Sequence, residues 1–187
     1  DTEPLLDDRQ KRLPFNRGIP DPFSGGLMRR NWEFYDYFRR RQEEGFTWEG
    51  KPISQVMPAG LGTDGPVTVA CNLRGASGFY TDLAADSAYA EELLGWITEA
   101  TIERITTYRE RLGIDLKTEG YGLADDAIQS ISTEMYRAQV LPFHRRLIDT
   151  FSKGGPNAIH LCGDATRFFR LLRDELDVRP DGQGPEP

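Results

Sequence analysis

Three short apolar runs, each followed by a stretch with helical spacing, constrain this chain more than any other feature of its sequence. The runs span residues 67–73, 114–118 and 158–162. Runs of this length that are bounded by glycines and contain β-branched residues are typical of buried strands. Alternating strands and helices with short connections imply right-handed crossovers and a parallel sheet. The pattern therefore predicts an α/β fold, either a barrel or a doubly wound sheet.

Capping residues predict where the intervening helices begin and end. Asp86 or its neighbour Ser87 can cap a long helix, and Gly113 stands where a left-handed residue would end it. Ser132 is a good cap for the next helix, which Pro142 should kink or restart. Asp164 can cap a third helix after the last run. The three apolar runs thus read as three successive β/α units.

The chain divides into three parts by composition. Residues 1–64 begin with a proline-rich, loop-like stretch and continue into a predicted helix over 27–44, whose arginines we expect on a solvated face. Residues 65–178 carry the β/α pattern, and the polar, Pro- and Gly-rich tail 179–187 is predicted to be disordered. With 187 residues and 38% hydrophobic content, one hydrophobic core is expected.

Charge and hydropathy exclude some classes of partner. A formal net charge of -7 argues against nucleic acid, whose binders usually present a basic face. No apolar run approaches the roughly 20 residues that cross a bilayer, and no signal-peptide pattern is present. We therefore expect a cytoplasmic protein without membrane contact. The two cysteines are too few for a disulfide framework, so metal binding, redox chemistry or packing are their candidate roles.

The carboxyl ends of the predicted strands give the candidate functional face, because ligand sites in parallel α/β folds lie there. His160 and Cys162 are two apart on a strand, so their side chains point the same way. Imidazole and thiolate together are typical zinc ligands. Spacing alone favours a packing role for such a strand cysteine. The residues gathered at this edge are Asn72, Arg74, Glu119, Tyr121, Asp125, Asp126, His160 and Cys162.

Several of these polar residues have a simpler interpretation. Glu119 follows a predicted strand directly and could orient a ligand or carry a proton. Asp125 and Asp126 could instead cap or solvate a loop. His144 stands beside two arginines in a predicted helix, which favours a surface or intra-helix role. Cys71 is expected to pack in the core.

Three motifs follow one another along the second half of the chain: GLADDAIQSISTEMYR at 122–137, VLPFHRRL at 140–147 and IHLCGDAT at 159–166. In this order they resemble the consecutive motifs of the uroporphyrinogen decarboxylase superfamily. GPVTVA at 65–70 is similar to the family's Gly-x-Pro-x-Thr strand, so the resemblance covers roughly 65–178. It implies a TIM-type (β/α)8 barrel. Because such barrels need about 250 residues, we expect an incomplete barrel of three to four β/α units, a fragment or reduced homologue whose open sheet edges favour self-association.

The resemblance also separates two kinds of chemistry. One branch of the family decarboxylates uroporphyrinogen without a cofactor, using an arginine-rich N-terminal motif, an aspartate and a tyrosine. Here Asn72 stands at the tyrosine position, and residues 1–46 lack the arginine-rich motif. The other branch comprises zinc-dependent methyltransferases that move a methyl group between a corrinoid protein and a thiol, using a His-x-Cys pair and a later cysteine. His160 and Cys162 occupy the pair's positions, and Cys71 is a substitute for the later cysteine if the fold brings it near.

The resemblance therefore implies a methyltransferase-like enzyme with zinc on His160 and Cys162, a small-molecule thiol as substrate and a corrinoid protein as partner. The remaining roles are Glu119 and Asp126 as catalytic residues, with Asn72, Arg74, Tyr121 and Asp125 contacting substrate. Cofactor-free decarboxylation of a tetrapyrrole, as in porphyrin biosynthesis, is the second hypothesis. An inactive family fragment is the third.

Overall fold

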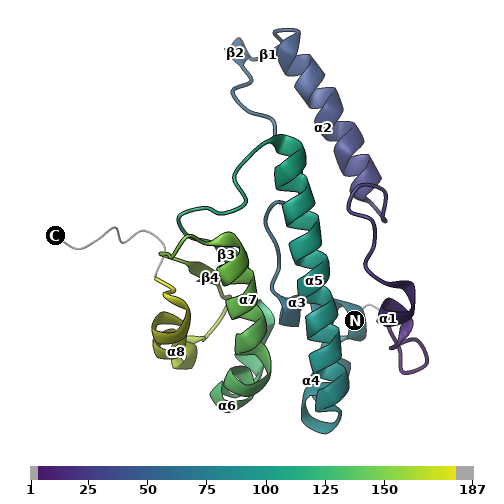
Figure 1. Cartoon of the computed structure of the whole chain (residues 1–187), viewed down its shortest axis with the longest axis vertical. Coiled ribbons are helices and arrows are strands. Elements are labelled where there is room, and N and C mark those ends of the chain that lie inside the picture. The colour runs from purple at the N-terminus through teal and green to yellow at the C-terminus, as the bar shows by residue number, and fades with distance from the viewer. Residues whose placement is uncertain (1–3, 180–187) are drawn as a thin grey trace, which may run out of the picture.

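In the computed structural model, which describes residues 4–179, helices surround a small parallel sheet (Figure 1). The chain begins with the short helix α1 (Leu13–Arg17) and the longer helix α2 (Met28–Glu43). A hairpin follows, formed by β1 (Thr47–Trp48) and β2 (Lys51–Pro52), which pair antiparallel. Helix α2 confirms the helix predicted over 27–44. The predicted disorder of the tail concerns residues that lie, except for Arg179, outside the described range.

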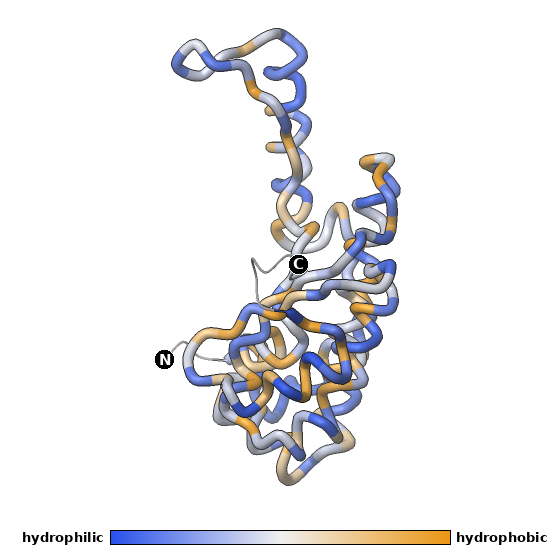
Figure 2. Tube along the Cα trace, turned by 90° about the vertical axis from the view of Figure 1, so that its left-hand side faces the viewer, coloured by the Kyte–Doolittle hydropathy of each residue, from blue (hydrophilic) through white to orange (hydrophobic). Residues whose placement is uncertain are grey.

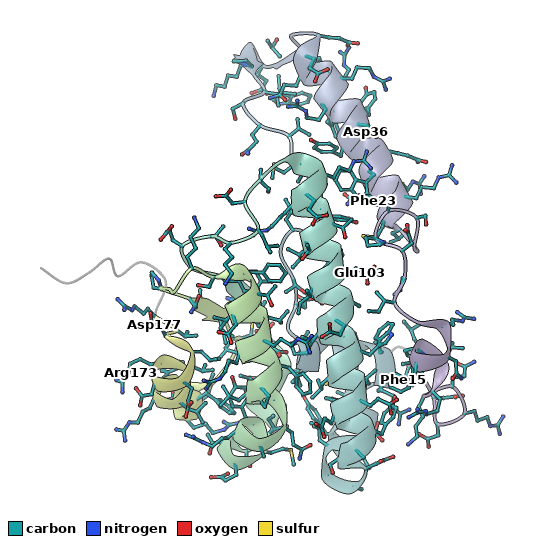
Figure 3. The ribbon with its side chains drawn as sticks, in the orientation of Figure 1. Phe15, Phe23, Asp36, Glu103, Arg173 and Asp177 are labelled. Atoms are coloured by element: carbon teal, nitrogen blue, oxygen red, sulfur yellow. The ribbon has the colours of Figure 1, made fainter. Side chains whose placement is uncertain are left out.

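Helix α2 and the hairpin form an arm that extends away from the rest of the molecule (Figures 1 and 2). An aromatic cluster holds the arm to the body. Trp32 is buried, with its ring centroid 5.3 Å from that of Phe23 and 4.8 Å from that of Tyr108. Figure 3 shows Phe23 between α2 and the helix that carries Tyr108. Beyond this cluster the arm is solvated, and Phe34 and Phe38 are exposed.

The predicted strand at 67–73 is wrong, because this segment is the helix α3 (Pro66–Arg74). Pro66 lies in the first helical turn, where its missing N–H costs nothing. The buried residues Val67, Ala70 and Arg74 recur at three- and four-residue spacing rather than in alternation. The β-branched run therefore follows a helical period. Helix α4 (Ala76–Ala85) continues directly from α3.

Helix α5 (Ser87–Leu112) confirms the predicted long helix and both of its ends. The Asp86 carboxylate accepts the Tyr89 N–H at its start, and Gly113 adopts a left-handed conformation with φ +65° at its end. The helix packs against α3 and α4 and, on its other side, against α7 (Leu141–Phe151) (Figure 1). It is the longest element of the body and connects the arm to the sheet.

The sheet is parallel, as predicted. Strand β4 begins at Ala158, where the third predicted strand begins, and is two residues shorter, whereas β3 lies outside all three predicted runs. Strand β3 (Gly122–Ala124) pairs in parallel with β4 (Ala158–His160), with Leu123 opposite Ile159. The predicted strand at 114–118 is wrong: Ile114 and Leu116 are exposed, and in this run a single bridge joins Thr118 to Ser152. Parallel bridges extend the ladder outward, from Asp64 to Ala124 and from Asn157 to Val178.

The crossover between β3 and β4 follows the predicted caps. It runs through the 3-10 turn η1 (Asp126–Ser130), α6 (Thr133–Met135), the π-helical turn η2 (Tyr136–Val140) and α7. Ser132 caps α6 by accepting the Met135 N–H at 3.1 Å, and Pro142 lies in the first turn of α7, so the helix restarts there. Asp164 accepts the Thr166 N–H at the start of α8 (Thr166–Leu176).

The core lies between α3, α4 and α5 on one side and β3, α7 and α8 on the other. Its largest fully buried apolar side chains include Phe79, Leu83, Leu93, Leu94, Ile105, Ile128, Tyr136, Leu147, Phe151, Phe168 and Leu172. Within residues 4–179, no helix combines the length and the hydropathy that a bilayer crossing requires. The domain boundaries predicted at 64/65 and 178/179 stay a prediction.

Candidate metal centre

The carboxyl ends of β3 and β4 bring three potential metal ligands together. Asp126 follows β3, His160 ends β4 and Cys162 comes two residues later. One ligand atom from each side chain lies within 4.8 Å of the other two. His160 Nε2 and Cys162 Sγ are 3.3 Å apart. In the part of the chain that the structure describes, this is the one group of three such residues.

Asp126 also contacts the chain around Cys162 directly. Its Oδ1 accepts the Cys162 N–H at 2.5 Å, which ties the turn after β4 to the end of β3. A hydrogen bond to the Asp126 carboxylate, together with its charge, raises the pKa of the Cys162 thiol. A cation placed among the three side chains would reverse this effect, because metal coordination favours the thiolate.

The donor set fits a zinc ion with an open coordination position. It offers one carboxylate oxygen, one imidazole nitrogen and one thiolate sulfur, and catalytic zinc sites use three protein ligands of these types. His160 and Cys162 are exposed and Asp126 is half-buried, so a substrate can reach the cluster. Cys71 does not belong to this group. Burial raises the pKa of its thiol to about 11, which suits packing.

Asp125 has a structural environment quite unlike that of its neighbour. Its side chain is fully buried, and its oxygens accept the N–H groups of Thr68 at 2.7 Å and Val67 at 3.2 Å. These are free N–H groups of the first turn of α3, so the carboxylate caps that helix. Gly65 makes this contact feasible, since a Cβ there would lie 2.3 Å from the Asp125 Cγ. No side chain other than glycine leaves room for the carboxylate.

His144 is fully buried, so the predicted surface or intra-helix role is wrong. Its Nε2 lies 2.7 Å from Asp125 Oδ2, and its Nδ1 lies 2.9 Å from the hydroxyl of Tyr136, which is also buried. Sequence reasoning missed the buried positions of both His144 and Tyr136. A signal was present: His144 lies between Val140 and Leu147 on the apolar stripe of α7, where a side chain faces the core.

Asn72 and Arg74 are not brought to the cluster as free groups. Both belong to α3 rather than to a strand end, and Asn72 is exposed. Arg74 is buried, and its guanidinium donates to Asp82 at 2.8 Å and to Asp8 at 2.9 Å. It also donates to the carbonyl oxygen of Leu6 at 2.6 Å. Its donors therefore hold the N-terminal segment and α4 to α3.

Glu119 and Tyr121 lie at the opposite end of β3 from the cluster, because the strand begins at Gly122 rather than ending at Thr118. Glu119 is exposed, with an oxygen 3.5 Å from the Lys153 amine. Tyr121 is buried, with its ring centroid 5.0 Å from that of Phe151. Burial raises the pKa of its phenol to about 12. The shift in strand position thus separates these two residues from Asp126.

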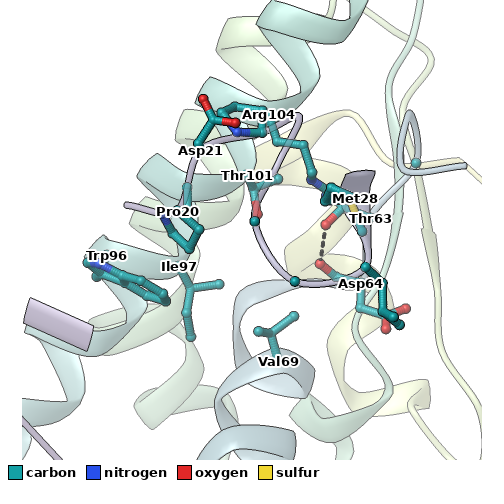
Figure 4. Close-up of a pocket in the computed structure, with 16 residues that line it drawn as sticks. Pro20, Asp21, Met28, Thr63, Asp64, Val69, Trp96, Ile97, Thr101 and Arg104 are labelled. Atoms are coloured by element: carbon teal, nitrogen blue, oxygen red, sulfur yellow. Dashed lines mark hydrogen bonds between the residues drawn. The ribbon is translucent and has the colours of Figure 1, made fainter. Parts of the chain in front are cut away.

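Two sizeable cavities lie beside the sheet. One, of about 790 Å³, has His160 in its wall together with Ile159, Leu161, Arg170 and residues of the α8 C-terminus. Figure 3 shows Arg173 and Asp177, which also line it, at that end of α8. The other, of about 830 Å³, lies between α5 and residues 20–28 and includes Arg104 and Trp96 (Figure 4). Of the three cluster residues, His160 lines the first cavity, and Asp126 and Cys162 line neither.

Comparison with known proteins gives a family and a fold. The chain has 18% sequence identity to a solved methyltransferase from Methanosarcina mazei, with a TM-score of 0.63. The superposition covers 92% of this chain and 46% of that one, so the chain spans less than half of its length. No curated protein matches the sequence. The family model for uroporphyrinogen decarboxylase (URO-D) matches residues 52–181, which is more than half of the chain. The protein belongs to the uroporphyrinogen decarboxylase family.

Proposed function

We propose that this chain is a methyltransferase-like member of its family, which binds zinc through Asp126, His160 and Cys162 and methylates a small-molecule thiol. The observation that carries the proposal is the cluster of three donors within 4.8 Å of one another at the carboxyl edge of the sheet. Asp126 takes the place of the third ligand that the resemblance assigns to a later cysteine. The fold likeness to a methyltransferase supports the same choice of chemistry.

The metal-binding residues would serve to activate the substrate thiol. Zinc, when bound here, lowers the pKa of a thiol at its open position so that a thiolate is present at neutral pH. The thiolate sulfur would form a bond to the methyl carbon of a methylated corrinoid, whose cobalt–carbon bond would break and leave its electron pair on cobalt. The cavity of about 790 Å³ beside His160 offers space for the thiol. A corrinoid protein is the proposed partner.

The arrangement of parallel segments supports an incomplete barrel as the scaffold. Asp64, β3, β4 and Val178 lie side by side in the order of the sequence, and helices separate each from the next. A doubly wound sheet reverses its strand order at one point, whereas a barrel keeps the sequential order. We therefore propose that these segments are the strands of three to four consecutive β/α units.

Arg74 and Asn72 give little support to the decarboxylase alternative. Arg74 is buried in ion pairs with Asp82 and Asp8, so its guanidinium is not available to acetate groups of a tetrapyrrole. Asn72 lies on the exposed side of a helix. Decarboxylation of uroporphyrinogen remains the outcome that would replace the proposal.

Metal content is the first test. The purified chain should hold zinc near one equivalent, measured by plasma mass spectrometry after dialysis against trace zinc. Cys162→Ser, His160→Ala and Asp126→Asn should each lower the content, because a site with two remaining ligands binds much more weakly. Cys71→Ser is the matched control, since it removes the other cysteine of the chain and should keep the zinc.

Activity then separates the hypotheses. Zinc-loaded protein should demethylate methylcobalamin when a thiol is added, with a change in the cobalamin absorption spectrum and a methyl thioether as product. The Cys162→Ser variant should lose this reaction. Absence of zinc from the wild type, or loss of carboxyl groups from uroporphyrinogen in metal-free protein, would contradict the methyltransferase proposal. If the protein binds no zinc and catalyses neither reaction, the result would favour an inactive family fragment.

A further inference from the structure

A buried chain of hydrogen bonds lies directly behind the proposed metal centre. It runs from the Tyr136 hydroxyl through the His144 ring to the Asp125 carboxylate, with separations of 2.9 Å and 2.7 Å. The three side chains come from η2, α7 and the end of β3, and all are fully buried. The chain continues from Asp125 to the first N–H groups of α3. It therefore connects three helical segments at the point where β3 ends.

The direction of these hydrogen bonds follows from the groups involved. Burial raises the pKa of the Tyr136 phenol, and the charge of Asp125 raises it further, so the hydroxyl keeps its proton and donates to His144 Nδ1. When the Tyr136 hydroxyl donates to Nδ1, the proton of the His144 ring is on Nε2, which donates to the Asp125 carboxylate. Asp125 thus accepts three hydrogen bonds: from His144, Thr68 and Val67.

The same segment is fixed on both sides of Asp126. The Asp125 N–H donates to the carbonyl oxygen of His160 at 3.1 Å, which joins the ends of the two strands. On the other side, the Ala127 N–H donates to Thr68 Oγ1 at 3.2 Å, and the Tyr80 hydroxyl donates to the Ala127 carbonyl oxygen at 3.0 Å. Asp126 stands between these two anchored residues, with a half-buried side chain.

We infer that the Tyr136–His144–Asp125 chain positions the Asp126 carboxylate beside His160 and Cys162, and so sets the affinity and geometry of the metal centre. This inference rests on the proposed function for its consequence. Tyr136, His144 and Asp125 are positioning residues, because they are fully buried and act through Asp126 and His160. Outer hydrogen-bond partners of metal ligands typically change metal affinity 10- to 100-fold when they are removed.

Tyrosine variants give a matched test. Tyr136→Phe removes one hydroxyl from the chain, whereas Tyr108→Phe removes an equally buried hydroxyl that donates to the Pro22 carbonyl oxygen at 2.7 Å, in the cluster that holds the arm. His144→Gln breaks the chain at its centre. Cobalt titration of each variant reports both affinity and coordination, through the thiolate–cobalt charge-transfer band and the d–d bands. Tyr136→Phe and His144→Gln should weaken cobalt binding about 10- to 100-fold and shift the d–d bands, while Tyr108→Phe should match the wild type.

The metal-free protein provides a second readout that does not depend on the proposed function. The protein has two histidines, so the NMR spectrum of His144→Gln contains the ring signals of His160 as its only histidine ring signals, and this spectrum assigns them. These signals should move in Tyr136→Phe and stay in place in Tyr108→Phe. If Tyr136→Phe leaves both cobalt binding and the His160 signals unchanged, the inference is overturned. The hydrogen bonds among Tyr136, His144 and Asp125 would then serve only to hold α3 in place. If the wild type binds no cobalt, the metal proposal fails, and the His160 signals decide the positioning role by themselves.

Discussion

The side chain of Tyr121 is buried, and among the described residues its hydroxyl makes no hydrogen bond that would stabilise the fold. Its ring packs on Phe151, and within residues 4–179 the hydroxyl has no hydrogen-bond partner. An unpaired buried hydroxyl costs free energy that an apolar group of the same shape would not. The sequence placed Tyr121 at the functional edge because it followed a predicted strand, but it precedes β3 instead.

Replacing Tyr121 by phenylalanine is therefore expected to preserve or raise stability. We expect Tyr121→Phe to increase the free energy of unfolding by about 1 kcal/mol at neutral pH, whereas Tyr108→Phe should lower it by about 1 kcal/mol, because it removes a formed hydrogen bond. Urea denaturation measures both. A loss in Tyr121→Phe equal to that in Tyr108→Phe would show that its hydroxyl has a partner.

The stabilities of the wild type and of Tyr121→Phe should also respond differently to alkaline pH. The pKa of Tyr121 is about 12 in the folded chain against 10.0 for an ordinary phenol, so folding favours its protonated form. This contribution to stability is complete below pH 10 and is lost as the pH rises toward 12. Tyr121→Phe should accordingly show a smaller fall in stability between pH 10 and 12.

At the scale of elements, the helices with clear capping residues were predicted well, whereas α3, α4 and the exact position of the strands were not. Asp86, Gly113, Ser132 and Pro142 mark helix ends by local chemistry, which the sequence contains. Strands β3 and β4 are three residues long, too short for an alternating pattern to identify them. The apolar run after Pro66 is a helix whose first N–H groups are accepted by Asp125, a residue far along the chain that no local pattern could point to.

The candidate site shows the same division between local and distant information. The motif at 159–166 predicted His160 and Cys162 as a pair, and the structure places them 3.3 Å apart. Asp126 was predicted as a catalytic residue rather than a ligand. Its contact with Cys162 joins residues 36 positions apart, and only the sheet register creates that contact.

The attachment of α2 provides a prediction at this scale. Trp32→Ala should remove the main contact between α2 and α5, a loss of roughly 3–5 kcal/mol when the cavity does not collapse. Amide hydrogen exchange should then accelerate in α2, while α7 and the core half of α5 keep their protection. Phe34→Ala is the control, because that side chain is 55% exposed. Equal loss of protection in α7 would mean that the arm and the body unfold together.

At the scale of the whole molecule, the parallel ladder has two outer sides. Among the described residues, no strand pairs beyond Asp64 on one side or beyond Val178 on the other. Such edges expose backbone groups that can pair with another chain. The superposition with the methyltransferase also covers only 46% of that protein.

We propose that this chain associates with itself through these edges. Sedimentation velocity over a wide concentration range should show a rise in the mean sedimentation coefficient, and dilution should reverse it. One species of 21.2 kDa at every concentration would contradict self-association.

The close approach of Gly65 to Asp125 also has an evolutionary consequence. A carboxylate at position 125 is compatible only with glycine at position 65, because a Cβ at position 65 would overlap the carboxylate. In the sequences of relatives, the two identities should therefore change together rather than drift separately. A relative with a larger residue at position 65 should lack the acidic residue at position 125, and it should therefore also lack the hydrogen bonds from the first N–H groups of α3 to that carboxylate.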